Sequence, residues 1–163
     1  MKRIVLAFAL MALAACGPNK KAADNLGAAK TFLAANAKAP GVVTLPSGLQ
    51  YKIVRSGPKD GLRPHPGDEV KVHYEGKLLD GKVFDSSYER GVPAAMPLDA
   101  LIPAWIEALQ LMRPGDEWVL YVPPALGYGE EGAGGGEIPG NSVLIFKIEL
   151  IGVLPGPGSV AQG

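Results

Sequence analysis

The sequence has very little of the side-chain chemistry on which most enzymes depend. Its 163 residues include one cysteine and two histidines, so an internal disulfide is impossible and a histidine-rich metal site is disfavoured. The motifs of phosphate-binding loops, serine hydrolases and zinc proteases (G-x-x-x-x-G-K-[ST], G-x-S-x-G and H-E-x-x-H) are absent. An enzyme with this sequence is therefore expected to work without a metal, a cofactor or a nucleophile-base pair.

The chain also lacks an excess of charge of either sign. Its 16 basic and 16 acidic residues cancel, whereas a nucleic-acid binder usually carries a basic excess. The sequence contains instead 15 prolines and 22 glycines, which predict many turns and short strands. Its apolar content of 47% is sufficient for the core of one globular domain.

The N-terminus has the layout of an export signal. Lys2 and Arg3 precede an apolar run over residues 4–12, which is too short to span a bilayer, a distance that needs about 20 residues. The following Leu-Ala-Ala-Cys resembles a bacterial lipobox. We therefore expect residues 1–15 to be a lipoprotein signal peptide and Cys16 to be lipidated. The alternative is an ordinary secretory signal followed by a stray cysteine.

Lipidation also accounts for an unpaired cysteine in an exported protein. Removal of the signal takes away two basic residues and leaves a formal charge of about −2, which again argues against a nucleic-acid partner. Gly17, rather than an aspartate, follows the cysteine. By resemblance to bacterial lipoproteins, this predicts a lipid-anchored protein at the outer membrane, facing the periplasm.

The segment 16–45 is expected to contain a lipidated tether and one short helix. Residues 17–23 read as the tether, and apolar residues then follow at helical spacing from Asp24, which is a candidate N-cap. The helix is expected to end before Pro40. About 22 residues separate the tether from Pro46, which is too little for a dimerisation module and a long stalk. We therefore expect a monomer.

The remaining periodicity predicts an α+β fold, in which a curved antiparallel sheet wraps around one short helix. Apolar and polar residues alternate in four segments (49–54, 70–75, 118–122 and 144–150), as in half-buried strands. Asp80-Gly81 is typical of a tight hairpin. Residues 85–100 read as a loop, and residues 103–112 have helical spacing. The glycine-rich segment 127–140 is expected to be an irregular, mobile loop.

Several motifs occur in an order that resembles the FK506-binding protein (FKBP) family of peptidyl-prolyl cis-trans isomerases. They are Val72-His73-Tyr74-Glu75-Gly76, Asp80-Gly81-Lys82-Val83-Phe84-Asp85-Ser86-Ser87, Leu101-Ile102-Pro103-Ala104-Trp105, Gly127-Tyr128-Gly129 and Leu144-Ile145-Phe146. The resemblance covers residues 46–152, and residues 41–51 are similar to the macrophage-infectivity-potentiator branch. The remaining tail, residues 153–163, is rich in proline, glycine and small polar residues and is expected to be disordered.

The resemblance implies a pocket that binds the proline of a substrate. Its implied catalytic residues are Tyr74, Phe84, Asp85, Ile102, Trp105, Tyr128 and Phe146, and its implied substrate-binding residues are Leu101, Ile138 and Arg90. In this family Trp105 would form the floor, Ile102 would offer its backbone N–H, and Tyr128 its hydroxyl. Any one of these aromatic residues alone is more often a plain core residue. The complete ordered set favours the pocket.

Asp85 is the only acidic residue of this implied site. By analogy with the family, its partners are Arg90 and the hydroxyl of Tyr74. A partly buried carboxylate requires such partners. Two interpretations remain open: Asp85 either holds the surrounding loop in place or acts electrostatically on the substrate. Both predict a loss of activity when it is replaced.

The resemblance implies that the protein isomerises X-Pro bonds in exported polypeptides while they fold, without a cofactor. It also implies FK506- or rapamycin-type macrolides as ligands, although Ala94 replaces a bulky aromatic residue and opens one wall. The main alternative is a non-enzymatic periplasmic holdase that uses the same apolar pocket. A purely structural lipoprotein is disfavoured, since it would need no pocket.

Overall fold

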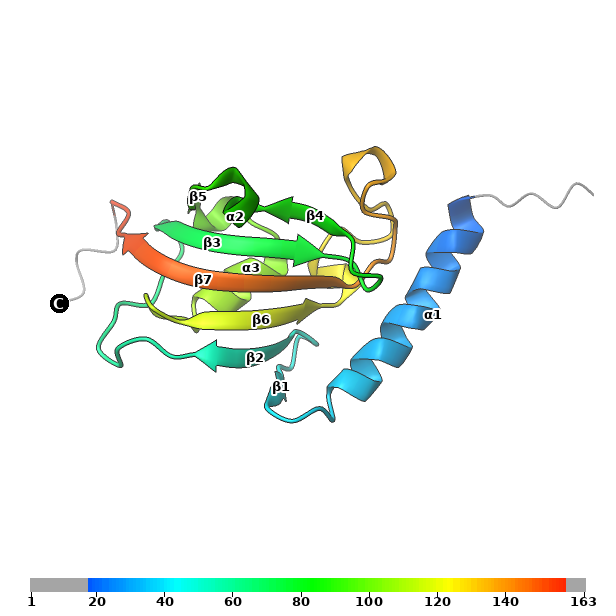
Figure 1. Ribbon diagram of the computed structural model, residues 1–163, viewed down its shortest axis with the longest axis horizontal. Helices are drawn as coiled ribbons and strands as arrows, with labels where there is room; N and C mark the ends of the chain where they lie inside the picture. The colour runs from blue at the N-terminus through cyan, green and yellow to red at the C-terminus, as the bar shows by residue number, and fades with distance from the viewer. Residues whose placement is uncertain (1–17, 158–163) are drawn as a thin grey trace, which may run out of the picture.

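The computed structural model describes residues 18–157, and it contains one curved antiparallel sheet with a short helix against one face (Figure 1). The expected signal peptide, Cys16 and Gly17 lie outside the described residues. The elements are α1 (Pro18–Asn36), β1 (Val42–Thr44), β2 (Gln50–Arg55), β3 (Glu69–Lys77), β4 (Val83–Ser86), α2 (Ser87–Arg90), β5 (Ala94–Pro97), η1 (Leu98–Ala100), α3 (Pro103–Leu109), β6 (Glu117–Val122), η2 (Pro124–Leu126), η3 (Gly134–Gly136) and β7 (Leu144–Leu154).

The sheet has seven strands in the order β1-β2-β6-β7-β3-β4, and β5 also pairs with β3. All pairs are antiparallel. Two strands share one edge of β3: β5 pairs with its first half and β4 with its second half. The single turn of α2 joins the two strands at this edge. The predicted α+β class, with a curved sheet around one short helix, is therefore confirmed.

The core lies between the sheet and α3. Val70, Val72 and Tyr74 of β3 are buried, while the intervening residues are exposed or half-buried, as expected for a strand with one face on the core. Pro103 occupies the first turn of α3, where a missing N–H costs nothing. The residues of α3 that pack on the sheet are Ala104, Trp105, Ala108 and Leu109, all of them buried.

The N-terminal helix differs from its prediction. It begins at Pro18 rather than Asp24 and ends at Asn36, so the predicted tether is wrong for residues 18–23. Proline is readily accepted as the first helical residue, and Asp24 lies inside the helix instead of capping it. Ala29 on α1 is buried. The side chain of Gln50 donates to the Leu33 carbonyl and accepts from Asn36, which fastens the end of α1 to the sheet.

Three further segments differ from the sequence-based boundaries. Residues 85–100 are not a plain loop, because they contain α2, β5 and η1, of which β5 pairs with β3 and α2 also contacts it. The sheet extends beyond residues 46–152 at both ends, through β1 and through the last two residues of β7. The N–H of Gly156 then donates to Asp68 at 2.9 Å. Residues 153–157 are thus held against the domain rather than belonging to a disordered tail.

Within residues 18–157, no helix combines the length and the apolar character needed to cross a membrane.

Candidate active site

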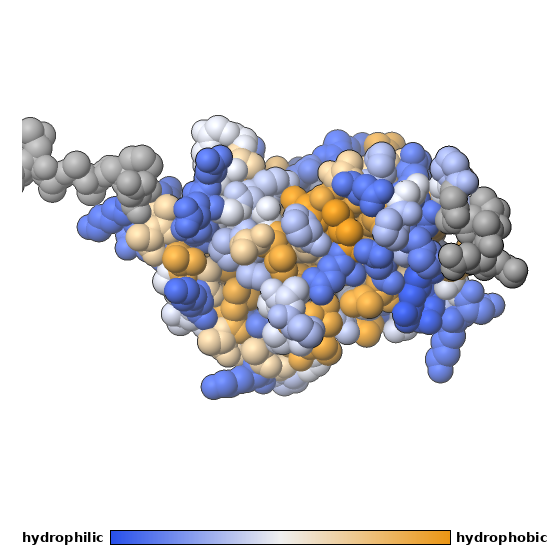
Figure 2. Space-filling view, turned by 180° about the vertical axis from the view of Figure 1, so that it is seen from behind, coloured by the Kyte–Doolittle hydropathy of each residue, from blue (hydrophilic) through white to orange (hydrophobic). Residues whose placement is uncertain are grey.

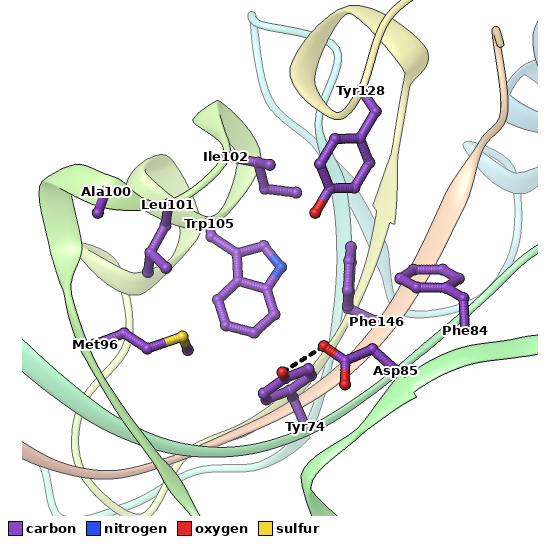
Figure 3. Close-up of a pocket in the computed structure, with 10 residues that line it drawn as sticks. All are labelled: Tyr74, Phe84, Asp85, Met96, Ala100, Leu101, Ile102, Trp105, Tyr128 and Phe146. Carbon is purple, nitrogen blue, oxygen red and sulfur yellow. Dashed lines mark hydrogen bonds between the residues drawn. The ribbon is translucent and has the colours of Figure 1, made fainter. Parts of the chain in front are cut away.

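A cavity of about 270 Å³ opens beside α3. Figure 3 shows the side chains that line it, which come from β3, β4, β5, η1, the link between η1 and α3, α3, β7 and the segment after η2. They are Tyr74, Phe84, Asp85, Met96, Ala100, Leu101, Ile102, Trp105, Tyr128 and Phe146. Seen from behind, the molecule gathers hydrophobic residues near the middle of its surface, with hydrophilic residues around them (Figure 2).

Aromatic rings in edge-to-face contact surround the cavity. The Trp105 ring meets Tyr74 at 5.0 Å between ring centroids and Phe146 at 5.2 Å, with interplanar angles of 82° and 87°. Phe146 in turn meets Phe84 at 5.6 Å and 89°. Such contacts add about 0.5–1.5 kcal/mol per pair beyond the burial of area. The rings therefore brace one another, and they leave Trp105 at the centre of an apolar recess.

At one side of the cavity, Asp85 forms a hydrogen-bond network with Tyr74 and Arg90. The Tyr74 hydroxyl donates to one carboxylate oxygen of Asp85 at 2.5 Å, and Arg90 donates to the other oxygen. Arg90 also donates to the Tyr74 hydroxyl at 2.9 Å, and its guanidinium lies 5.5 Å from the centre of the Tyr74 ring. Both oxygens of the carboxylate thus have partners inside the protein.

This network moves the pKa values of Tyr74 and Asp85 apart. Burial, together with the hydrogen bond to Asp85, raises the pKa of Tyr74 above its ordinary value. Burial alone would also raise the pKa of Asp85, but the hydrogen bonds from Tyr74 and Arg90 outweigh it and lower that pKa below its ordinary value. Near neutral pH the pair is therefore a phenol and a carboxylate, and neither titrates.

Ser87 holds the backbone of Tyr74 through two hydrogen bonds. The sequence analysis did not predict this role. It is fully buried at the point where the edge of β3 passes from β4 to β5. Its hydroxyl accepts from the Tyr74 N–H at 2.7 Å, donates to the Tyr74 carbonyl at 3.2 Å, and lies 2.8 Å from Nδ1 of His73. Tyr74 pairs with Ile148 of β7 on one side, and on the other side, where neither β4 nor β5 reaches it, Ser87 takes the place of a strand partner. The Ser86-Ser87 pair was visible in the sequence, but its role depends on this gap in the ladder.

Most of the predicted site residues meet at the cavity, but two do not line it. Ile138 is buried in the core and pairs with Ala133 across an isolated bridge. Arg90 contacts the network from the rim, with 47% of its side chain exposed. Conversely, Met96 and Ala100 line the cavity without having been predicted. They lie in β5 and η1, the segment that the sequence analysis read as a loop.

Two residues place possible hydrogen-bond donors around the opening. The Tyr128 side chain reaches toward the cavity with its hydroxyl (Figure 3). Ile102 is the N-cap of α3, and its carbonyl accepts from the N–H groups of Trp105 and Ile106 at 2.9 and 3.1 Å. This fixes the backbone of Ile102 at the mouth. The cavity is thus suited to an apolar ring that is attached to a polar backbone.

The residues that the structure describes offer little for metal binding or for histidine-based catalysis at the cavity. No group of three or more His, Cys, Asp and Glu side chains occurs there that could hold a metal ion. His73 stacks on Tyr88 with 4.7 Å between ring centroids, and His65 lies beside Asp68. Neither histidine lines the cavity.

The fold and the cavity define an α+β domain with an aromatic recess, and comparisons with known proteins give its family. Residues 61–151 match the model of the FKBP-type peptidyl-prolyl cis-trans isomerase, and residues 3–53 match the domain amino terminal to such isomerases. The chain belongs to the FKBP-type peptidyl-prolyl cis-trans isomerase family.

Three similar proteins come from bacteria. The peptidyl-prolyl cis-trans isomerase Mip of Coxiella burnetii is 53% identical over 79% of this chain and 55% of its own length. The outer membrane protein MIP of Legionella longbeachae is 49% identical over 88% of this chain and 60% of its own length. The crystal structure of FkpA from Escherichia coli is similar with a TM-score of 0.80 and 44% identity, over 86% of this chain and 64% of that chain. The chain thus spans little more than half the length of the curated relatives.

Proposed function

We propose that this protein accelerates the cis-trans interconversion of X-Pro bonds in polypeptides that fold outside the cytoplasm. The observation that carries the proposal is the recess above Trp105, whose ring is flanked edge-on by Tyr74 and Phe146. A pyrrolidine ring is a compact apolar group that such a recess accommodates. The proposed catalytic residues are Tyr74, Phe84, Asp85, Ile102, Trp105, Tyr128 and Phe146, with Leu101 in the wall and Arg90 at the rim.

The proposed mechanism uses desolvation and hydrogen bonds, without covalent chemistry. Amide resonance imposes a barrier of about 18–20 kcal/mol on rotation of the peptide bond. The planar amide is more dipolar than the twisted one, so removing water from the substrate carbonyl favours the twisted state. Donors fixed in advance then hold the rotated carbonyl at little further cost. The Ile102 N–H and the Tyr128 hydroxyl are the proposed donors.

A holdase that binds unfolded chains in the same recess is the competing function. The two are separated by a protease-coupled isomerisation assay with a Leu-Pro or Phe-Pro peptide and residues 17–163. Acceleration supports the isomerase. Suppression of aggregation without any acceleration supports the holdase and contradicts the proposed enzyme. The edge-to-face rings favour the isomerase, because a holdase gains nothing from a recess shaped for one ring.

We also propose where the protein works. Cys16, at the end of a lipoprotein signal over residues 1–15, is proposed to carry the lipid that tethers the domain to the outer membrane on its periplasmic side. Two observations support this: the Leu-Ala-Ala-Cys sequence and the name of the Legionella relative, an outer membrane protein. The 19-residue α1 then follows almost at once and leaves the domain close to the membrane.

Two further properties belong to the proposal. The domain is proposed to be a monomer, because α1 buries Ala29 and hydrogen-bonds to Gln50 of β2 within the same chain. Its substrates are proposed to be proline-containing polypeptides, with FK506- or rapamycin-type macrolides as additional, weaker ligands. The resemblance to the family supports the weaker affinity, since Ala94 stands where the best-known members carry a bulky aromatic residue.

A further inference from the structure

One residue of the cavity lining, Tyr128, lies on a segment that is hydrogen-bonded at its base to the N-terminal helix. Residues 127–140, the Tyr128 loop, run from the end of η2 to the residue before Asn141. Tyr128 is the only residue of this loop that lines the cavity, and the loop contains seven glycines. The N–H groups of Gly127 and Gly129 donate to the Pro124 carbonyl at 3.0 and 2.9 Å. The position of Tyr128 thus depends on η2 on one side and on the rest of the loop on the other.

The loop is folded tightly on itself in spite of its glycines. A Cβ at Gly140 would lie 1.9 Å from the Glu130 carbonyl oxygen, and one at Gly132 would lie 2.0 Å from that of Ile138. These approaches are open only to glycine. The Gly132 N–H donates to the Tyr128 carbonyl at 3.1 Å. The loop is therefore a compact unit that is closed by its own backbone contacts.

Asn141 closes the base of the loop in an unusual conformation. Its φ is 58°, and it is the only non-glycine residue with a positive φ among residues 18–157. Its N–H donates to the Gly129 carbonyl at 2.8 Å, directly after Tyr128. Asparagine tolerates this left-handed region better than most residues. Asn141 is 8% exposed, so its side-chain amide needs partners within the protein.

The side chain of Asn141 finds its partner on α1, which lies beside the loop in Figure 1. Its Nδ2 donates to the Ala22 carbonyl at 3.0 Å, and Asn25 of α1 donates back to the Gly140 carbonyl at 2.9 Å. Two reciprocal hydrogen bonds thus join α1 to the base of the loop. In the described part of the chain, these are the only two hydrogen bonds between α1 and residues 127–141.

We propose that α1 positions the Tyr128 loop, with Asn141 as the positioning residue, and that this positioning raises kcat/KM for isomerisation. The proposal rests on the proposed isomerase function. Asn141 does not touch the substrate, and its effect passes through the Tyr128 hydroxyl. Because α1 directly follows the expected lipid anchor, any force on the anchor is transmitted to the loop through these two hydrogen bonds.

The test uses two disruptive variants and one control. Asn141→Gly retains the positive φ without strain and removes only the side-chain bond. Asn25→Ala removes the reciprocal bond. Asn36→Ala is the matched control, because it breaks the contact of α1 with Gln50, at the end of the helix away from the loop. The first readout is hydrogen exchange of the loop amides in the full domain.

We expect Asn141→Gly and Asn25→Ala to speed exchange within residues 127–140, while Asn36→Ala leaves these amides unchanged. The second readout is kcat/KM on a Leu-Pro peptide. Asn141→Gly should lower it by about two- to tenfold, the range for one hydrogen bond to the substrate. The same change in a Tyr128→Phe background should have no further effect, since the hydroxyl is already gone. A purely structural role of Asn141 would not show this dependence.

The possible failures are distinct. If the wild type accelerates no isomerisation, the proposed function is wrong, and hydrogen exchange alone then decides whether α1 holds the loop. Loop exchange that is unchanged in Asn141→Gly overturns the inference. It is also overturned if Asn141→Gly lowers kcat/KM equally with and without the Tyr128 hydroxyl, or leaves the activity of an active wild type unchanged.

Discussion

The Tyr74 hydroxyl donates a hydrogen bond of 2.5 Å to the carboxylate of Asp85, and Arg90 contacts both groups. The side chain of Asp85 is 42% exposed, so solvent screens part of its charge. The carboxylate has two interpretations, as a support for the Tyr74 ring or as a charge that acts on the substrate. Its geometry favours support, because both oxygens already have partners in the protein.

Two substitutions of Asp85 separate these interpretations. Asp85→Asn keeps an oxygen that accepts from Tyr74, and we expect kcat/KM on a Leu-Pro peptide to fall by no more than about fivefold. Asp85→Leu removes the acceptor and should lower kcat/KM by about tenfold or more, since a hydrogen bond to a charged group contributes about 1.5–3 kcal/mol. Equal losses in both variants would show that the charge itself is required.

The pH dependence of activity should be nearly flat from about pH 6 to 8. The pKa of Tyr74 is raised and that of Asp85 is lowered, so both keep one protonation state across this window. A histidine titrates near 6.5, but neither His65 nor His73 lines the cavity. The measurement is kcat/KM against pH for the wild type, His65→Ala and His73→Ala. A steep profile that disappears in either variant would contradict the mechanism.

The same pKa shift predicts how stability depends on acid. Because the pKa of Asp85 is lower in the folded protein than in the unfolded chain, its contribution is complete above the unfolded value of about 3.9. It is lost as the pH falls through the folded pKa. The difference in unfolding free energy between the wild type and Asp85→Asn should therefore be constant from pH 5 to 8 and shrink below about pH 4. Urea unfolding at each pH checks this, and a difference that grows in acid would contradict it.

Removing the floor of the cavity should affect activity more than any loss of a polar group. Trp105→Ala is expected to lower kcat/KM by more than Asp85→Leu does, and to cost about 3–5 kcal/mol of stability. Leu109→Ala on the same helix is the control, because Leu109 is fully buried but does not line the cavity. Both variants are first shown to be folded by circular dichroism. If Leu109→Ala lowers kcat/KM as much as Trp105→Ala, the loss reflects the fold and not the recess.

Anchoring and assembly can be checked directly. Cys16→Ser should move the protein from the membrane fraction to the soluble fraction, and the wild type should incorporate labelled fatty acid. A wild type without label would contradict lipidation at Cys16.

The domain without its lipid should sediment as a monomer at micromolar concentration, since α1 packs on its own domain through Ala29, Gln50 and Asn141. A stable dimer would refute this expectation.

The sequence was informative where a residue sits in a strongly periodic element or an ordered motif. Tyr74, Trp105 and Phe146 lie on the inner faces of β3, α3 and β7, so their convergence followed from alternation and helical spacing. Met96 and Ala100 could not be found in this way. They belong to short elements with no period of their own, and β5 exists only because it pairs with β3.

The glycine-rich loop also shows what a local sequence pattern cannot predict. Its composition predicted an irregular path, but not the bridge between Ala133 and Ile138 that turns Ile138 into the core. The role of Asn141 was equally hidden, because its partner Ala22 is more than a hundred residues away in the sequence. Contacts of this kind are set by tertiary packing, which a local pattern does not record.

The chain has two tryptophans, and they occupy very different surroundings. Trp105 lines the cavity, whereas Trp118 is buried and stacks on Tyr51 with 4.3 Å between ring centroids, away from the lining residues. We therefore expect a ligand that enters the recess to change the emission of Trp105 and to leave that of Trp118 as an internal reference. Fluorescence of a Trp118→Phe variant would report occupancy from Trp105 alone, so affinities for proline peptides and macrolides can be measured without a label and without turnover.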